Sequence, residues 1–267
     1  MGRTGCRLHA FPEGLPFARA LGRAAGAEVR PIELHRFPDG ESLVRVRAPA
    51  GRDAVVVRPL DAPNDKLVEV VLAADALRRA GAGRVTLVAP YLGYMRQDAV
   101  FAPGQSLSQR AIAAMLGGAF DRVLTVEAHL HRVATLAEVF PVPALSVSAS
   151  PAIHRAIAGG IPWVVGRKLR RGDRDVRVAL PRVRAERVVV VDDVASSGRT
   201  IAATADRLRR AGVRRVDAVV VHAVFARGAL RAMREQGVSR VVSCDTIAHR
   251  TNAIPVAGLL AQALGAA

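Results

Sequence analysis

The segment that most constrains the fold runs from residue 188 to 200 and reads Val-Val-Val-Val-Asp-Asp-Val-Ala-Ser-Ser-Gly-Arg-Thr. Its four consecutive β-branched residues, with no polar alternation, are typical of a parallel strand buried on both faces. Two acids follow, and a loop of small residues then leads into a stretch with apolar residues at helical spacing. This pattern predicts a strand–loop–helix unit of an α/β fold, whose ligands bind at the carboxyl ends of the strands.

The same alternation of strands and helices continues along most of the chain. We expect strands over 42–47, 54–58, 84–89, 122–126, 187–191, 215–221 and 240–243, and helices over 65–80, 106–116, 198–211 and 227–236. Strands separated by helices of this length form βαβ units and therefore a mainly parallel sheet. Two helix ends share the run Arg-Arg-Ala-Gly, at 78–81 and 209–212, which suggests two related halves. The proline-rich stretch 140–143 is the expected boundary, giving domains 1–142 and 143–267.

Composition narrows the class of protein further. The 267 residues include 39 Lys+Arg and 23 Asp+Glu, a formal charge of +16, and only Lys66 and Lys168 are lysines. An arginine surplus suits anionic partners such as nucleotides, sugar phosphates or nucleic acid, although a compositional bias also explains much of it. Short, interrupted apolar runs exclude a membrane span. Cys6 and Cys244 form no disulfide framework, so a reducing, cytoplasmic location is expected.

The loop that follows Asp192 and Asp193 has the chemistry of a phosphate site. A helix that begins near Gly198 presents free backbone N–H groups to an anion, and Ser196, Ser197 and Thr200 add hydroxyl donors. The neighbouring carboxylates suit ribose hydroxyls or a metal. Helix capping without a ligand is the alternative explanation.

Two further segments carry candidate anion-binding groups. In the polar loop after the strand 84–89, Arg96 offers a guanidinium for phosphate, with Gln97 and Asp98 able to orient it. Later, after a strand expected over 163–165, Lys168 and Arg170 lie two apart in an expected extended segment, so both point to the same side. They are typical of an anion clamp, and a solvated hairpin is the alternative.

These motifs together resemble one family. The 188–200 segment is similar to the phosphoribosyl-pyrophosphate (PRPP) signature of type I phosphoribosyltransferases and of ribose-phosphate pyrophosphokinases, or PRPP synthetases. The loop 90–108 resembles the nucleotide-side motif of PRPP synthetases, which simple phosphoribosyltransferases lack. Residues 36–41 resemble the adenine-contacting loop of that family, and 125–129 resemble its strand-end acid and histidine. The tail, with 243–247 and a closing helix at 259–264, also follows the family.

The resemblance implies a fold and a set of roles. The fold is two tandem phosphoribosyltransferase-like α/β domains, with ATP bound by the first and ribose 5-phosphate by the second. The implied ATP-binding residues are Phe37, Asp39, Glu41, Arg96, Gln97 and Asp98. The implied ribose-5-phosphate residues are Asp192, Asp193, Ala195, Ser196, Ser197, Gly198 and Thr200. Lys168, Arg170 and His129 would be catalytic, and His129 would also bind the Mg²⁺ cofactor.

One part of the family pattern is absent. PRPP synthetases carry a strand ending in Pro-Asp, with a following helix, before the clamp segment; that Asp joins the histidine in metal binding, and its turn holds pyrophosphate. Here residues 148–158 run through Gly159 and Gly160 directly into 161–163. We therefore expect one central strand and one Mg²⁺ ligand to be missing. Three outcomes are then open. The enzyme works with substitute ligands such as Asp192, Asp193 and water, its activity is impaired, or the chain binds nucleotides without catalysis.

The resemblance implies transfer of pyrophosphate from Mg²⁺–ATP to the 1-hydroxyl of ribose 5-phosphate, in a chain expected to be a homo-oligomer. Two rivals remain: a phosphoribosyltransferase, which has no need of the Arg96 and Phe37 loops, and a non-catalytic regulator of the same fold. Nucleic acid is not favoured as a partner, because the sequence carries no recognition-helix motif and no interleaved aromatic residues.

Overall fold

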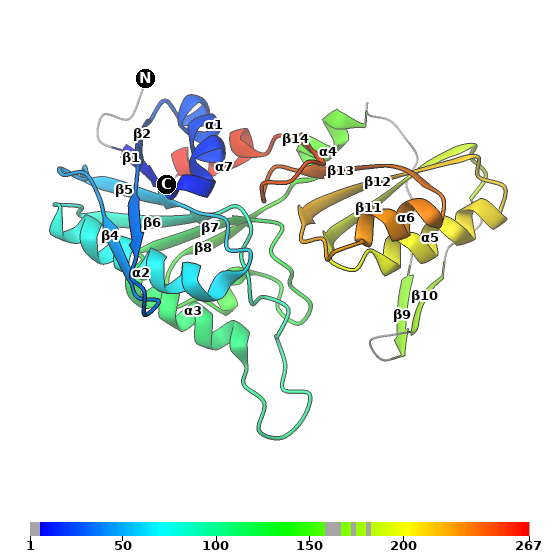
Figure 1. Cartoon of the computed structure of the whole chain (residues 1–267), viewed down its shortest axis with the longest axis horizontal. Helices are drawn as coiled ribbons and strands as arrows, with labels where there is room; N and C mark the ends of the chain where they lie inside the picture. The colour runs from blue at the N-terminus through cyan, green and yellow to red at the C-terminus, as the bar shows by residue number, and fades with distance from the viewer. Residues whose placement is uncertain (1–5, 158–166, 172–174, 180–182, 267) are drawn as a thin grey trace. The chain divides into compact units, whose positions relative to one another are not determined.

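The computed structural model describes residues 6–157, 167–171, 175–179 and 183–266. The chain divides into two compact units, one comprising Met1–Ala149 with Val256–Ala267 and the other Ser150–Pro255. Each unit is built around a parallel sheet with helices packed against it (Figure 1). The predicted α/β class, with mainly parallel sheets, is confirmed.

The first unit contains six parallel strands in the order β2-β1-β5-β6-β7-β8. Their bounds are β1 Cys6–Ala10, β2 Glu28–Pro31, β5 Asp53–Val57, β6 Arg84–Ala89, β7 Arg122–Val126 and β8 Ala144–Val147. Helices α1 (Leu15–Ala25) and α7 (Ala257–Gly265) lie on one face, and α2 (Pro63–Arg79) and α3 (Ser108–Ala119) on the other (Figure 1). Because both faces are covered, the central strands are buried almost throughout.

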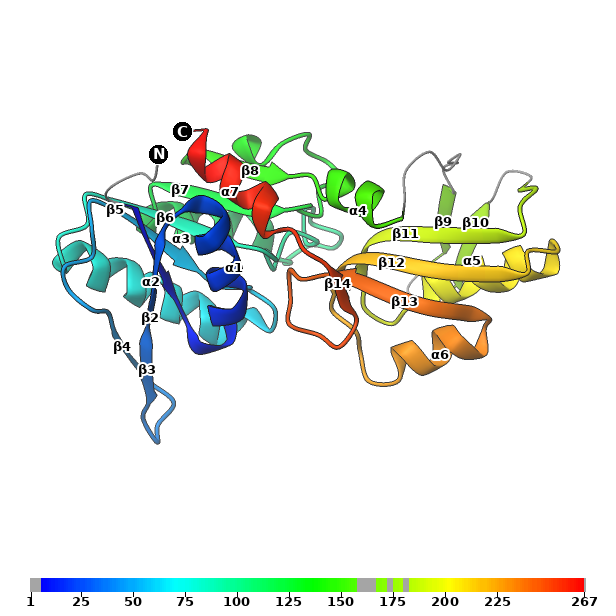
Figure 2. The same cartoon turned by 90° about the horizontal axis from the view of Figure 1, so that it is seen from above.

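A small antiparallel hairpin lies outside this sheet. It consists of β3 (Glu33–Arg36) and β4 (Ser42–Arg45), and Arg36 pairs with Ser42 at its closed end. Strand β4 packs beside α2, and Figure 2 shows the hairpin extending away from the parallel sheet. Two short 3-10 turns, Pro12–Gly14 and Leu136–Glu138, complete the first unit.

In the second unit, the described residues form four parallel strands in the order β11-β12-β13-β14 and a separate hairpin, β9-β10. Their bounds are β9 Arg167–Arg171, β10 Asp175–Ala179, β11 Arg187–Ala195, β12 Arg215–Ala223, β13 Val238–Cys244 and β14 Asn252–Ile254. The helices are α4 (Ser150–Ala156), α5 (Arg199–Arg210) and α6 (Ala229–Glu235). Side chains of α5 and α6 form one apolar core with those of β12.

The structure corrects the predicted end of one strand. We expected the strand that carries the Asp-Asp pair to end at Val191, but β11 continues to Ala195 because it stays in register with β12 as far as Ala223. Among the described residues β11 is an edge strand, and Val191 is 51% exposed. An edge position is what the loss of a neighbouring strand predicts. The strand expected over 163–165 lies outside the described residues.

The compact units differ from the predicted domains 1–142 and 143–267 in two places. Strand β8, at 144–147, pairs with β7 and so belongs to the first unit. Helix α7 packs against α1, β7 and β8 and returns the chain to the same unit. The prolines at 141 and 143 therefore mark the loop before an edge strand. Within the described segments, no helix is both long and apolar enough to cross a bilayer.

Packing of the C-terminal helix leads to a test of this arrangement. The side chain of Leu260 in α7 is fully buried. We expect Leu260→Ala to lower the free energy of unfolding by about 2–5 kcal/mol, because truncation removes apolar contacts and leaves a cavity. The first unit should be destabilised, and amide hydrogens of β7 should exchange faster. The control is Gln262→Ala, two residues further along the same helix and exposed; an equal loss in both variants would contradict the packing.

Candidate functional site

The candidate ATP loop, residues 37–41, is the turn of the β3-β4 hairpin. The backbone N–H of Phe37 donates to the carbonyl of Glu41 (2.8 Å), and that of Gly40 to the carbonyl of Phe37 (2.9 Å). Gly40 adopts a φ of 93°, and the Glu41 N–H donates to Asp39 Oδ1 (3.1 Å). Phe37 is 40% exposed, and its ring meets that of His35 edge-on at 4.8 Å between centroids. The loop thus presents a supported aromatic ring and two carboxylates to solvent.

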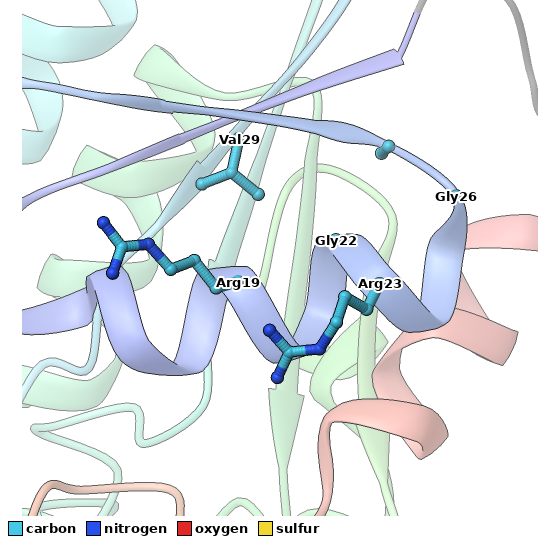
Figure 3. Close-up of a pocket in the computed structure, with 6 residues that line it drawn as sticks. Arg19, Gly22, Arg23, Gly26 and Val29 are labelled. Carbon is cyan, nitrogen blue, oxygen red and sulfur yellow. The ribbon is translucent and has the colours of Figure 1, made fainter.

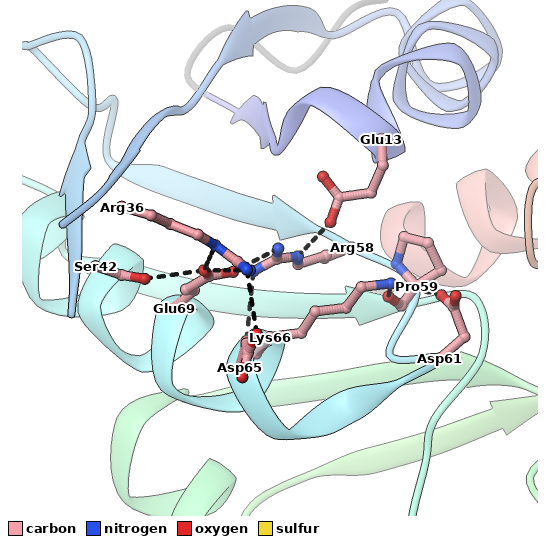
Figure 4. A network of polar contacts seen from close by, with 9 residues as sticks. All are labelled: Glu13, Arg36, Ser42, Arg58, Pro59, Asp61, Asp65, Lys66 and Glu69. Atoms are coloured by element: carbon pink, nitrogen blue, oxygen red, sulfur yellow. Dashed lines mark hydrogen bonds and ion pairs between the residues drawn. The ribbon is translucent and has the colours of Figure 1, made fainter. Parts of the chain in front are cut away.

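A buried carboxylate holds the base of this loop (Figure 4). Glu69 on α2 and Arg58 after β5 are 1% and 2% exposed and form an ion pair at 2.6 Å, from Oε2 to Nη2. Glu69 Oε1 accepts hydrogen bonds from Arg36 Nη2 (2.9 Å) and Ser42 Oγ (3.0 Å). Away from Glu69, Arg58 Nε donates a hydrogen bond to Glu13 Oε1 (2.8 Å). The Arg58 guanidinium carbon also lies 3.8 Å from the centroid of the Phe11 ring.

Charge and burial act against each other on Glu69. Burial raises the pKa of its carboxyl, but the hydrogen bond and positive charge of Arg58, assisted by Ser42 and Arg36, outweigh burial and hold the pKa below its ordinary value. Our sequence analysis did not identify this pair. Glu69 stands on the inward face of α2 with Val70 and Ala73, and an acid at an inward helical position is the signal that could have found it.

The loop after β6 carries Arg96, Gln97 and Asp98. Arg96 is exposed, and the carbonyl of Gln97 accepts from the N–H of Gln109 (3.2 Å). Asp98 is held from another loop, because Arg132 Nη1 donates to Asp98 Oδ1 at 2.5 Å. The Asp98 side chain is 2% exposed, and its Oδ2 has no hydrogen-bond partner among the described residues. Arg96 therefore points into solvent without a protein partner in the described part of the chain.

His129 follows β7 in a tightly held turn. Glu127, with a φ of 38°, accepts at Oε1 from Ser148 Oγ (2.6 Å) and from the N–H of Ala149 (2.8 Å). The Ala128 N–H donates to Ser146 Oγ at 2.8 Å. The His129 ring meets the ring of His131 edge-on, at 4.1 Å between centroids. These contacts fix the backbone from which His129 projects.

No three His, Cys, Asp or Glu side chains of the described residues gather into a metal-binding cluster. Mg²⁺ does not need such a cluster, because one or two protein ligands usually hold it together with water and substrate phosphates. The carboxylates of Asp192 and Asp193, in the second unit, offer the oxygen donors that Mg²⁺ prefers, and the expected ligand His129 lies in the first unit.

In the second unit, the strand–loop–helix predicted over 188–200 is present. Gly198, with a φ of 71°, immediately precedes α5, and no side chain caps the first turn of that helix. A Cβ at Gly198 would lie 3.0 Å from Met233, so both backbone and space require glycine there. The Ser196 carbonyl accepts from the N–H of Ala226 (3.0 Å). The loop thus presents the Ser197 and Thr200 hydroxyls and uncapped N–H groups, as an anion site requires.

The two acids lie within the strand and not beyond its end. Asp192 and Asp193 are consecutive residues of β11, three and two positions before its last residue. Asp193 Oδ1 accepts from the N–H of Val194 at 2.7 Å, and both acids are half-buried. Ala195, the last residue of β11, is buried.

Lys168 and Arg170 lie on β9, for which the structure describes the backbone. They stand opposite Val178 and Val176 in the antiparallel register with β10. The expected extended segment is thus present, and the shared direction of the two cations stays a prediction. Strand β10 lies close to α5, the helix that follows the phosphate loop.

A shallow hollow of about 460 Å³ lies at the end of α1, away from all these residues (Figure 3). It is lined by Arg19, Gly22, Arg23, Gly26, Ala27 and Val29. Both arginines are exposed helix residues. None of the candidate residues lines it, so it does not contribute to the candidate site.

Two parallel-sheet units, one with an Asp-Asp strand and an uncapped phosphate loop, define a phosphoribosyltransferase-like protein. Comparison with known proteins identifies the family. The sequence model of the N-terminal domain of ribose phosphate pyrophosphokinase matches residues 8–119, and that of the phosphoribosyl transferase domain matches 138–259. The chain belongs to the ribose-phosphate pyrophosphokinase family.

Individual relatives agree with this membership. A ribose-phosphate pyrophosphokinase of Methanopyrus kandleri is 32% identical over 96% of this chain and 97% of its own length. That of Thermococcus kodakarensis is 34% identical over 87% of this chain and 89% of its own. The fold matches a crystal structure of phosphoribosylpyrophosphate synthetase from Mycobacterium smegmatis, with a TM-score of 0.83, 24% identity and 98% coverage of both chains. Two tandem phosphoribosyltransferase-like domains are thus confirmed.

The buried Glu69 carboxylate makes stability depend on pH. Because its pKa is lowered on folding from 4.5, its contribution is complete above that value and is lost as pH falls through the folded pKa. At neutral pH, Glu69→Gln should cost about 3–5 kcal/mol of unfolding free energy, because Arg58 is left buried without its counter-charge.

Denaturant titrations measure the difference in unfolding free energy between wild type and Glu69→Gln. This difference should become smaller as the pH is lowered below about 4.3, where carboxyls of the unfolded chain protonate. Glu33→Gln is the control, since that carboxylate is 72% exposed and its ion pair with Arg45 spans 3.7 Å. A difference between wild type and Glu69→Gln that does not change with pH would contradict the assigned charge state.

Proposed function

We propose that this chain is a ribose-phosphate diphosphokinase, which transfers the β,γ-diphosphoryl group of ATP to the 1-hydroxyl of ribose 5-phosphate and yields PRPP and AMP. Family membership supports this proposal. The observation that carries it is the presence in one chain of the phosphate loop 196–200 and of the nucleotide-side loops 37–41 and 96–98. A simple phosphoribosyltransferase needs only the first of these.

In this reaction, the 1-hydroxyl oxygen of ribose 5-phosphate bonds to the β-phosphorus of ATP, and the bond from that phosphorus to the α,β-bridging oxygen breaks. AMP leaves with the bridging oxygen, and the hydroxyl proton passes to solvent. Such transfers depend on positioning and on charge neutralisation more than on covalent catalysis by the protein. A site composed of cations, acids and backbone N–H groups is therefore sufficient.

Each group of residues then has a task. The uncapped N–H groups of α5, with Ser196, Ser197 and Thr200, bind the 5-phosphate, while Gly198 and Ala195 let the backbone approach it. Asp192 and Asp193 accept hydrogen bonds from the ribose hydroxyls.

On the ATP side, Phe37 stacks on the adenine, and Asp39 and Glu41 accept from its amino group. Arg96, with Gln97 and Asp98 in the same loop, meets the phosphates. Lys168 and Arg170 stabilise the negative charge on the transferring group.

Mg²⁺, bound with the ATP phosphates, would neutralise their charge. His129 is its proposed ligand, and the carboxylates of Asp192 and Asp193 are available where the family's Pro-Asp residue is missing. ATP and ribose 5-phosphate are the proposed partners. We also propose a homo-oligomer in the cytoplasm, where Cys6 and Cys244 would stay reduced; no disulfide joins them.

The absence of the Pro-Asp unit favours one alternative, a non-catalytic nucleotide-binding protein of the same fold. That unit would supply a metal ligand and a pyrophosphate turn, and residues 148–163 contain neither. The alternative protein would bind ATP without releasing AMP.

An assay of AMP release tests the proposed activity. With ATP, ribose 5-phosphate and Mg²⁺, wild type should form AMP in amounts equal to PRPP. Lys168→Ala should lower kcat about 100-fold or more, since it removes a charge aimed at the transition state. The control is Arg171→Ala, which removes one cation from the same strand at a position to which the proposal assigns no role.

A folded wild-type protein that forms no AMP but binds ATP would favour the non-catalytic alternative. Base consumption with PRPP in the absence of ATP would favour a phosphoribosyltransferase. Full activity in Lys168→Ala would contradict the role of that lysine alone.

The phosphate loop is tested separately by Gly198→Ala. The substitution strains a positive φ and forces Met233 to move, so we expect KM for ribose 5-phosphate to rise roughly tenfold, the effect of about 1.4 kcal/mol of lost binding. KM for ATP should stay within about twofold. The matched control is Gly212→Ala, which has a φ of 93° just beyond the other end of α5 with open space around its Cβ. Equal effects on the two KM values would contradict the assignment.

A further inference from the structure

The β3-β4 hairpin depends on outside contacts for its orientation. An isolated two-stranded hairpin is marginally stable in water, and this one pairs with no strand of the six-stranded sheet. Side chains alternate along it, so Leu34, Arg36, Ser42 and Val44 share one face. Leu34 and Val44 are half-buried against the core of the first unit, which fixes the open end of the hairpin.

At the closed end, one carboxylate oxygen accepts hydrogen bonds from both sides of the loop. Arg36 and Ser42 form the last pair of the hairpin, immediately before and after the loop 37–41. Both donate to the same oxygen, Oε1 of Glu69, with Arg36 Nε at 3.1 Å and Ser42 Oγ at 3.0 Å. Arg36 Nη1 also approaches Asp65 Oδ2 at 3.2 Å. Both ends of the loop are thus attached to helix α2 (Figure 4).

Glu69 cannot easily turn away from this position. Its other oxygen faces the buried guanidinium of Arg58, which Glu13 and the Phe11 ring hold from the opposite side. A charge-assisted pair inside the protein is strong, and breaking it leaves a buried charge unpaired. The carboxylate is therefore a rigid point of attachment.

The exposed face of the hairpin carries the ring that the attachment would orient. Phe37 lies beside His35, a residue of the face opposite to Arg36 and Ser42. Aromatic stacking on a base needs a ring held in a defined plane before the ligand arrives, since ordering it on binding costs affinity.

We propose that Glu69 and Arg36 are positioning residues for nucleotide recognition: together they fix the loop 37–41 so that Phe37, Asp39 and Glu41 are preset for adenine. The inference rests on the proposed function of this loop. Neither Glu69 nor Arg36 touches the substrate. Their contribution is to the affinity and base selectivity for ATP, and not to the transfer step or to ribose 5-phosphate.

Steady-state kinetics of Arg36 variants test this proposal. Arg36 is 52% exposed, so Arg36→Ala leaves the buried Glu69–Arg58 pair intact. We expect KM for ATP to rise roughly tenfold, corresponding to about 1.4 kcal/mol, and the preference for ATP over GTP to fall. KM for ribose 5-phosphate and kcat should change less than about twofold. Arg36→Lys, which keeps the charge but loses the two-pronged contact, should be intermediate, and Ser42→Ala should give a smaller effect in the same direction.

The matched control is Arg45→Ala, at the open end of the same hairpin. Its ion pair with Glu33 spans 3.7 Å, and its side chain is 76% exposed. This variant should behave as wild type.

Unchanged KM for ATP in folded Arg36→Ala and Ser42→Ala, or an equal rise in Arg45→Ala, would overturn the positioning proposal and leave the proposed function standing. If wild type forms no AMP, the proposed function fails, and titration calorimetry with ATP then decides the positioning proposal. Weaker binding by Arg36→Ala than by Arg45→Ala would support it, and equal binding or no binding by wild type would overturn it.

Discussion

Parallel strand pairing is the constraint on which both halves of this protein depend. Strands β5, β6, β7 and β8 all run in the same direction, so their carboxyl ends reach one edge of the sheet. Arg58, the Arg96 loop and the His129 turn each follow one of these strands and are therefore brought to the same edge. In the second unit the phosphate loop follows β11 in the same way. Within each unit, the shared direction of the strands thus brings motifs that are far apart in the sequence to one edge of the sheet.

A charged side chain at the end of a buried strand destabilises the fold unless an opposite charge is paired with it. The guanidinium of Arg58 is 2% exposed, and an unpaired charge in that position would be strongly destabilising. Glu69 supplies the counter-charge and still has an oxygen available for Arg36 and Ser42. The same contact that makes a buried arginine tolerable therefore attaches the loop 37–41 to the core. Structural stability and the preset geometry of the loop depend on one carboxylate.

Much of this organisation could be read from the sequence. The β-branched runs at 84–89 and 122–126 match β6 and β7, and the helix expected after Gly198 is α5. Strand β1, reading Cys-Arg-Leu-His-Ala, was missed because its sequence carries no β-branched residue and is a strand only through pairing with β2 and β5. The end of β11 was placed too early because its polar Asp192 and Asp193 imitate a loop.

Contacts between distant residues were beyond what spacing can reveal. Arg58 and Glu69 lie on different elements, as do Asp98 and Arg132. No periodic pattern links the members of either pair, and each pair depends on the packing of the whole unit. The absence of a Pro-Asp unit, in contrast, is an expectation from the sequence, and the edge position of β11 among the described residues agrees with it.

The central claim is that this protein transfers an intact diphosphoryl group. Phosphorus NMR of a mixture of the protein, Mg²⁺, ATP and ribose 5-phosphate measures this directly, because it identifies every phosphorylated product. We expect PRPP and AMP to appear in equal amounts, with no ADP. Formation of ADP, or an unchanged spectrum from folded protein that binds ATP, would contradict the claim.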